Sequence, residues 1–180
     1  MSFITDIPLS DLFAGFSLFL VVMSGMFACY KWCCDVALKR ASYINELTGK
    51  IRTDLDISDT LYMLDYDRSW YSPAFHSGGP LEFKMDRTLS YFAYICYLRK
   101  HRIISDNEFV FFEYHLERIL RNQGVRDYLY NLYHFTKKAN LILSHQYLFE
   151  YGKKNSFFDP DFFDSTAHRT NPNYHRYLNF

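Results

Sequence analysis

The chain has no lysine or arginine before Lys31, although it contains twenty of these basic residues in total. A secretory signal peptide needs a basic beginning, a short apolar middle and a small-residue cleavage site. The first residues instead carry Asp6 and Asp11, and the apolar run that follows ends at Tyr30, directly before Lys31 and Trp32. The lack of early basic residues therefore favours a retained segment over a cleaved leader.

The sequence also lacks the short motifs that most often identify an enzyme. It has no glycine-rich phosphate loop and no nucleophile elbow. Its histidines do not combine with carboxylates at a spacing typical of zinc sites, and its cysteines show no paired metal spacing. We therefore expect no catalytic residues, no metal and no cofactor. The cysteines are predicted to be free thiols in a reducing compartment: Cys29, Cys33, Cys34 and Cys96.

The charge balance gives no general reason to expect a nucleic acid as a partner. The whole chain has a formal charge of zero, and Asp6 and Asp11 are two of its twenty acidic residues, so the part after residue 30 carries a formal charge of +2. The chain contains 18 phenylalanines and 16 tyrosines, whose rings could stack on single-stranded RNA. These rings follow helical spacing without an interleaved basic track, so we predict core packing and no direct RNA binding. Part of the tyrosine excess fits a protomer interface.

Residues 12–30 contain no charged side chain and are predicted to form a transmembrane helix. At ~1.5 Å per residue, about 20 apolar residues cross a hydrocarbon layer of ~30 Å. We therefore predict three segments. Residues 1–11 form a short extracytoplasmic N-terminus, residues 12–30 span the membrane, and residues 31–180 form a cytoplasmic helical domain.

Basic residues next to the predicted span indicate its orientation. Lys31, Lys39 and Arg40 follow the apolar run, and cytoplasmic flanks of membrane helices are enriched in such residues. Tyr30 and Trp32, on either side of Lys31, suit the aromatic belt at a membrane interface. The lipid bilayer is thus one predicted partner, with the C-terminal domain on its cytoplasmic side.

Small residues recur along one stripe of the predicted span, at steps of three and four. Such residues allow close approach of helices in lipid, and these steps are typical of a left-handed helix seam. The stripe predicts self-association, and in a ring of copies Ser17 and Ser24 would line a narrow pore. The alternative is a lone anchor whose serines bond to their own helix. The stripe consists of Ala14, Ser17, Val21, Ser24 and Ala28.

Beyond the span the sequence predicts an all-α protein. The first helix is expected to continue to a stop at Gly49, and the following segment, 53–80, reads as a surface loop with a short helix near 61–64. Helical steps then predict a central helix over 85–99, and Ser105 with Glu108 predicts a capping box at the start of the next helix.

Two further helices complete the predicted body. One follows an interruption at Gly124 and begins with Val125, and the last contains Leu141, His145 and Leu148 and ends before Gly152. Short connections between successive helices favour antiparallel neighbours, so we predict a helical bundle.

The C-terminal segment contains an arginine and a histidine that match a known spacing. Arg169 and His175 fit the Arg-x4-6-His motif of the HEPN superfamily of ribonucleases, which are also helical bundles. Imidazole can move protons near neutral pH and guanidinium can hold a phosphate. Pro172 lies between the two residues and disrupts a continuous helix there. The motif is therefore degenerate, and a structural role for both residues is the alternative.

Taken together, these features resemble the small single-span membrane accessory proteins of type VI-B CRISPR systems, which accompany an RNA-guided RNA-cutting nuclease. The resemblance covers the architecture of the whole chain. It implies a ring-shaped homo-oligomer in the bacterial inner membrane, with a HEPN-like body and Arg169 and His175 as the degenerate motif. It further implies a pore that depolarises the membrane and enhances anti-phage defence, functionally linked to the nuclease.

Three functions follow as hypotheses from different classes. The first is the oligomeric defence pore, which is not an enzyme. The second is a membrane-tethered helical adaptor that recruits a cytoplasmic partner, and the third is a membrane-bound ribonuclease of the HEPN type. Only the third would assign catalysis to Arg169 and His175.

Overall fold

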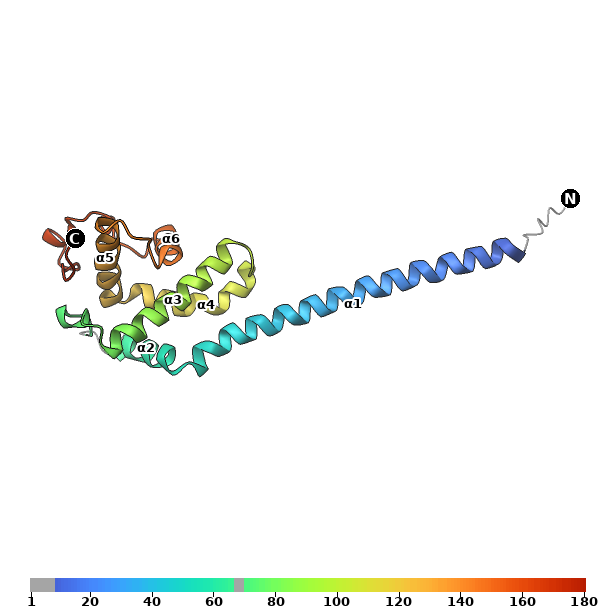
Figure 1. Cartoon of the computed structure of the whole chain (residues 1–180), viewed down its shortest axis with the longest axis horizontal. Helices are drawn as coiled ribbons and strands as arrows, with labels where there is room; N and C mark the ends of the chain where they lie inside the picture. The colour runs from blue at the N-terminus through green and yellow to red at the C-terminus, as the bar shows by residue number, and fades with distance from the viewer. Residues whose placement is uncertain (1–8, 67–69) are drawn as a thin grey trace. The chain divides into compact units, whose positions relative to one another are not determined.

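The computed structural model describes residues 9–66 and 70–180, and every regular element in this part of the chain is helical (Figure 1). Two compact units, 1–47 and 48–180, make up the chain, and each is described by itself. The predicted N-terminal segment 1–11 lies mostly outside the described residues. The elements are α1 (Leu9–Thr53), α2 (Leu55–Tyr66), η1 (Pro73–Phe75), α3 (Pro80–Lys100), α4 (Asp106–Arg121), α5 (Gln123–Lys138), α6 (Gln146–Lys154) and η2 (Ala167–Arg169).

The first unit is a single helical segment, the part of α1 that ends at Leu47. Every side chain described between Phe13 and Trp32 is exposed. Within α1, Phe13–Thr53 is long and apolar enough to cross a membrane, with a mean hydropathy of 1.9 in its most apolar window. The prediction of an all-α chain with one long apolar N-terminal helix is confirmed.

The helix does not stop at Gly49, so that prediction was wrong. α1 continues to Thr53, whose Oγ1 donates to the carbonyl oxygen of Gly49 at 3.2 Å. A glycine inside a helix costs about 1 kcal/mol relative to alanine. Here the next turn carries Ile51, which is buried, and its burial offsets that cost. The chain instead breaks at Asp54, whose Oδ1 accepts a hydrogen bond from the amide of Asp56 at 3.2 Å and starts α2.

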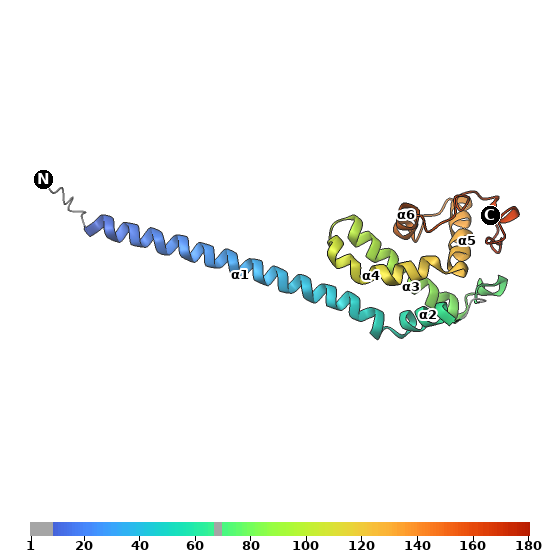
Figure 2. The same cartoon turned by 180° about the vertical axis from the view of Figure 1, so that it is seen from behind.

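Helix α3 is the centre of the second unit. Met85, Leu89, Phe92 and Ile95 are completely buried, as expected for a helix with apolar side chains on most of its circumference. α2 and α6 pack on opposite sides of α3, and α4 also contacts it (Figures 1 and 2). The predicted central helix is confirmed. α2 spans Leu55–Tyr66, so the segment expected to be mainly loop contains a helix of 12 residues.

The capping box at the start of α4 is confirmed. Ser105 Oγ accepts from the amide of Glu108 at 3.4 Å, and the Glu108 carboxylate accepts from the amide of Ser105 at 2.6 Å. The next break falls at Asn122, whose Oδ1 accepts from the amide of Val125 at 3.1 Å and caps α5. Gly124, predicted as the interruption, lies inside the first turn of α5.

Gly124 and Gly152 are needed for close packing and do not end helices. A Cβ atom on Gly124 would lie 2.8 Å from Nε1 of Trp70, and one on Gly152 would lie 2.4 Å from Cε2 of Phe158. Helix α6 starts after His145 and continues through Gly152, so the predicted boundaries of the last helix were wrong. In both cases an aromatic ring from outside the helix leaves no room for a Cβ atom.

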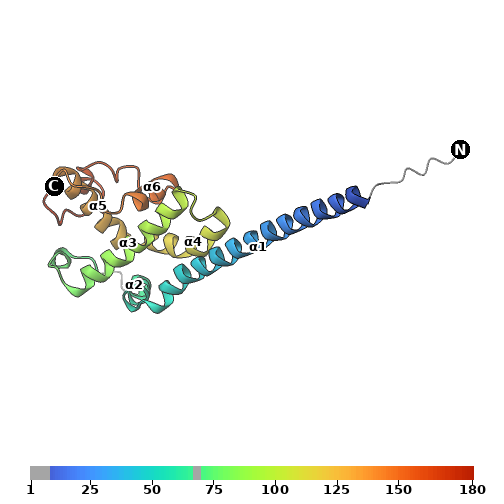
Figure 3. The ribbon, with the colours of Figure 1, turned by 45° about the vertical axis from the view of Figure 1, so that its right-hand side comes forward.

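The segment after α6 is irregular and packs aromatic rings against α5 and α6 (Figure 3). Phe158 stacks on Phe162 with ring centres 4.1 Å apart, and Tyr174 stacks on Tyr130 of α5 at 4.5 Å. These rings are buried. The predicted use of aromatic residues in the core is therefore confirmed.

The contact between Gly152 and Phe158 leads to a stability prediction. Gly152→Ala should lower the free energy of unfolding by about 1–3 kcal/mol, because the stacked Phe158 ring cannot move away without disturbing Phe162. Gly49→Ala is the matched control, since a Cβ there meets open space in a helix and should stabilise by up to about 1 kcal/mol. Denaturant titration of both variants in detergent checks this, and equal stabilities would contradict it.

Candidate functional site

The predicted packing stripe lies on the surface of α1. All of its residues are exposed: Ala14, Ser17, Val21, Ser24 and Ala28. Large apolar side chains such as Phe16 and Phe27 are exposed as well, so this segment presents a largely apolar surface that other residues of the chain leave open. Ser24 Oγ donates to the carbonyl oxygen of Val21 at 2.9 Å, which satisfies its hydroxyl hydrogen within the helix.

The predicted membrane-interface residues continue this exposed surface. Tyr30, Lys31 and Trp32 are all exposed, and α1 passes through them without a break. An interfacial aromatic pair next to a lysine can place its rings at headgroup depth while the ammonium group stays in water.

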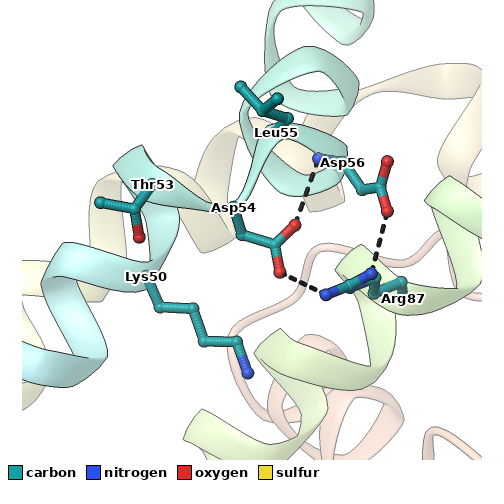
Figure 4. Close-up of a pocket in the computed structure, with 6 residues that line it drawn as sticks. All are labelled: Lys50, Thr53, Asp54, Leu55, Asp56 and Arg87. Atoms are coloured by element: carbon teal, nitrogen blue, oxygen red, sulfur yellow. Dashed lines mark hydrogen bonds and ion pairs between the residues drawn. The ribbon is translucent and has the colours of Figure 1, made fainter.

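A salt-bridge cluster surrounds the end of α1 and the start of α2 (Figure 4). Arg87 of α3 places one guanidinium nitrogen 2.8 Å from Asp54 Oδ2 and the other 2.9 Å from Asp56 Oδ2. Lys84 lies 3.0 Å from Asp59 on the neighbouring turn. A planar guanidinium that holds two carboxylates fixes their direction better than an ammonium group would.

This cluster lines a shallow open pocket together with Lys50, Thr53 and Leu55. The Lys50 ammonium lies 5.6 Å from the centre of the Tyr91 ring. Because the two carboxylates already bind Arg87, the pocket offers no carboxylate set for a cation. Its role is structural: it fastens the last turn of α1 and the first turn of α2 to α3.

The two residues of the degenerate HEPN-like motif have different environments. The ring Nδ1 of His175 lies 2.6 Å from Asp127 Oδ2, and the amide of His175 donates to Asp127 Oδ1 at 2.8 Å. Arg169 is exposed at the end of η2. The structure thus pairs His175 with a buried aspartate of α5, while Arg169 faces solvent. Burial raises the pKa of the Asp127 carboxyl, and the hydrogen bonds from His175 oppose that rise.

Asn131 holds the same part of the C-terminal segment. Its Nδ2 donates to the carbonyl oxygen of His175 at 2.7 Å, and its Oδ1 accepts from the amides of Tyr177 and Leu178 at 2.7 and 3.1 Å. Asn131 is fully buried. One amide side chain therefore satisfies three backbone groups, and with Asp127 it fixes the segment 175–178 on α5.

A network of tyrosines, histidines and carboxylates lies nearby and was not predicted. Tyr71 Oη lies 2.8 Å from His76 Nε2, and His76 Nδ1 lies 3.6 Å from Glu82 Oε1. The His76 ring stacks on Tyr128, whose hydroxyl donates to Asp86. Burial raises the pKa of both tyrosines and lowers the pKa of His76, while Glu82 acts in the opposite direction on His76.

His145 is the most enclosed histidine of this region. It is 2% exposed, and Asp86 Oδ1 is 4.0 Å from its Nε2. Burial lowers the pKa of His145, and the nearby carboxylate opposes this only in part. The ring is therefore neutral near pH 7.

The remaining ionisable groups do not form a metal centre. Within residues 9–66 and 70–180, no three histidine, cysteine, aspartate or glutamate side chains gather in a way that would hold a metal ion. The four cysteines are free, and burial raises the pKa of the Cys96 thiol to about 12. The groups described above make hydrogen bonds and charge pairs that hold the body together, and the side chain of His175 is half-exposed on its surface.

Loss of the Asn131 side-chain amide should release the segment 175–178 from α5. In Asn131→Ala, three backbone groups lose their partner, so the amides of Tyr177 and Leu178 should exchange with deuterium about tenfold faster or more. His175→Ala is the control, because it leaves these bonds to Asn131 in place. Hydrogen exchange with mass spectrometry measures both, and unchanged exchange in Asn131→Ala would disprove the role of Asn131.

Acid should destabilise the body. Burial lowers the pKa values of His76, His115, His134 and His145 below the ordinary 6.5, so the unfolded chain binds protons first as the pH falls. Stability is therefore fully present above about pH 6.5 and decreases below it. Melting temperatures between pH 5 and 8 test this. His145→Phe should flatten the pH dependence, and a wild-type melting temperature that rises on acidification would contradict the assignment.

The chain was also compared with known proteins. No family model, curated protein or solved structure matches it.

Proposed function

We propose that this chain is a single-span protein of the bacterial inner membrane, with residues 12–30 in the bilayer, the N-terminus outside and the body in the cytoplasm. The observation that carries this proposal is the exposure of every described side chain from Phe13 to Tyr30 on a helix without a charge in that segment. So much apolar surface is unfavourable in water and is removed from water by lipid. The basic residues after Tyr30 support the orientation.

Copies of the chain assemble through α1 into a ring that encloses a pore. The stripe of small residues supports this, because small side chains are what allow helices to approach closely in lipid. Ser24 donates its hydroxyl hydrogen to Val21 of its own helix, as the lone-anchor alternative expects, and its oxygen can still accept a hydrogen bond from water or from a neighbouring helix.

The pore depolarises the membrane and in this way enhances an RNA-guided anti-phage defence. This part of the proposal is supported by the resemblance to the accessory proteins of type VI-B CRISPR systems, which also implies a HEPN-like body. The pairing of His175 with Asp127 supports a structural role for His175.

The second candidate function is a membrane-tethered adaptor. The observation that favours it is a set of large apolar side chains exposed on the body, including Tyr66, Phe83 and Phe111. Such side chains are enriched at protein interfaces. In this function α1 would only localise the body, and its small residues would tolerate substitution.

Substitution in the stripe separates the two functions. Ser17→Leu and Ser24→Leu should break the assembly and abolish depolarisation, because a large side chain prevents close approach of helices. Gly15→Leu is the matched control. A Cβ atom on Gly15 meets open space within the chain, and Gly15 lies roughly 140° around the helix from the centre of the stripe, at 3.6 residues per turn.

Light scattering of the detergent-solubilised protein and a membrane-potential dye in expressing cells give the two readouts. The proposal expects a defined oligomer and depolarisation for the wild type and Gly15→Leu, and loss of both for the serine variants. A wild-type monomer with an unchanged potential would overturn the pore and leave the adaptor.

A further inference from the structure

The outer surfaces of α2 and α4 form one exposed aromatic face. Arg118 of α4 joins the two helices, since it donates to the carbonyl oxygen of Leu61 at 2.7 Å, binds Asp65, and lies 6.0 Å from the ring of Tyr114. Helical spacing puts Tyr62 beside Tyr66 on α2, and Val110 and Phe111 beside Tyr114 on α4. We call this surface the aromatic face; it consists of Tyr62, Tyr66, Val110, Phe111 and Tyr114, which are 58–85% exposed.

The connection between α5 and α6 presents a second apolar surface. Leu141 and Ile142 are adjacent, and Ile142 is 92% exposed. Together with Lys137 and Lys153 they line a groove that also contains Phe149. We call residues 137–146 with Lys153 and Lys154 the lysine loop.

The lysine loop is held at both ends. Asn140 adopts φ +53°, and the amide of Leu141 donates to the carbonyl oxygen of Thr136 at 2.9 Å, which is a Schellman end for α5. On the other side, His145 is buried and Gln146 donates to the carbonyl oxygen of Leu143 at 3.3 Å. Ile142 is therefore presented in a fixed position, which lowers the entropy lost on binding.

The two surfaces carry opposite charge. α2 and α4 together contain seven carboxylates and two arginines, and Lys84, Arg87 and Arg99 of α3 pair with four of these carboxylates, which leaves a formal charge of −2. α5 and α6 together contain five basic and two acidic residues, a formal charge of +3. Opposite charge around two apolar patches favours their association and sets its orientation.

The two surfaces also lie on different sides of the body. α2 and α6 pack on opposite sides of α3, as Figures 1 and 3 show. They cannot meet within one chain, but they can meet between neighbouring chains. A closed ring of more than two copies requires such a pair of unlike faces, because a surface that binds itself closes at a dimer.

We propose that neighbouring copies associate head to tail, with the lysine loop of one copy bound to the aromatic face of the next. Ile142 and Leu141 contact the aromatic rings, and the lysines around them face the carboxylates of α2 and α4. This inference rests on the proposed ring assembly and adds the contact between bodies that defines its direction.

Crosslinking tests the proposal in the full chain. In a background with Cys29→Ser, Cys33→Ser and Cys34→Ser, Cys96 remains as a buried thiol of low reactivity. Two differently tagged chains carry Phe111→Cys and Ile142→Cys, respectively. They are co-expressed, and their membranes are treated with a short bismaleimide.

The expected product contains both tags and appears only in the mixture. One chain with both cysteines should give a ladder of covalent oligomers, because each link leads to the next copy. As a control, Asn173→Cys, at an exposed position outside both surfaces, should give no product with Ile142→Cys.

The other outcomes are distinguishable. Dimers of Ile142→Cys chains alone would indicate a self-binding contact and overturn the proposal. No product, with an intact oligomer by light scattering of the same sample, would overturn this contact and leave the proposed pore. If the cysteine of Ile142→Cys forms no crosslink but reacts with a reagent dissolved in the lipid, the lysine loop contacts the membrane, and the proposed contact is overturned. A monomeric wild-type protein would overturn both the head-to-tail contact and the proposed pore.

Discussion

Burial of α3 on all but one face is the constraint on which the body depends. Phe83, Arg87, Ser90 and Tyr94 form its exposed stripe, and α2, α4 and α6 pack on the other faces. The irregular C-terminal segment is then placed by α5, through Asp127 and Asn131. Arg87 connects the start of α2 to α3, and Arg118 connects α2 to α4. The body is thus organised by one apolar helix and stabilised at its edges by a small number of polar side chains.

The chain divides its apolar residues between two purposes. In the body, aromatic rings fill the interior and stack on each other, as Phe158, Phe162, Tyr130 and Tyr174 do. In α1, mainly aliphatic residues and phenylalanines are exposed along a segment that the chain itself leaves open. The hydrophobic effect therefore stabilises the core of the body, and it also favours a non-aqueous environment around the apolar segment of α1.

Local signals predicted much of this fold. The uncharged run, the buried pattern of α3 and the capping box at Ser105 depend on residues close together in the sequence, and all were recognised. Gly49, Gly124 and Gly152 were misinterpreted as helix breaks. Gly124 meets Trp70 from a distant part of the sequence and Gly152 meets Phe158 beyond the end of its own helix, whereas Gly49 lies in open space inside α1. The network around Tyr71 and Tyr128 joins residues about 50 positions apart, and no spacing rule reveals such contacts.

The salt bridges of Arg87 have a mechanical consequence. Arg87 grips Asp54 and Asp56 on both sides of the single break between α1 and α2. Rotation of the first turn of α2 relative to the last turn of α1 would therefore have to break one of these two salt bridges.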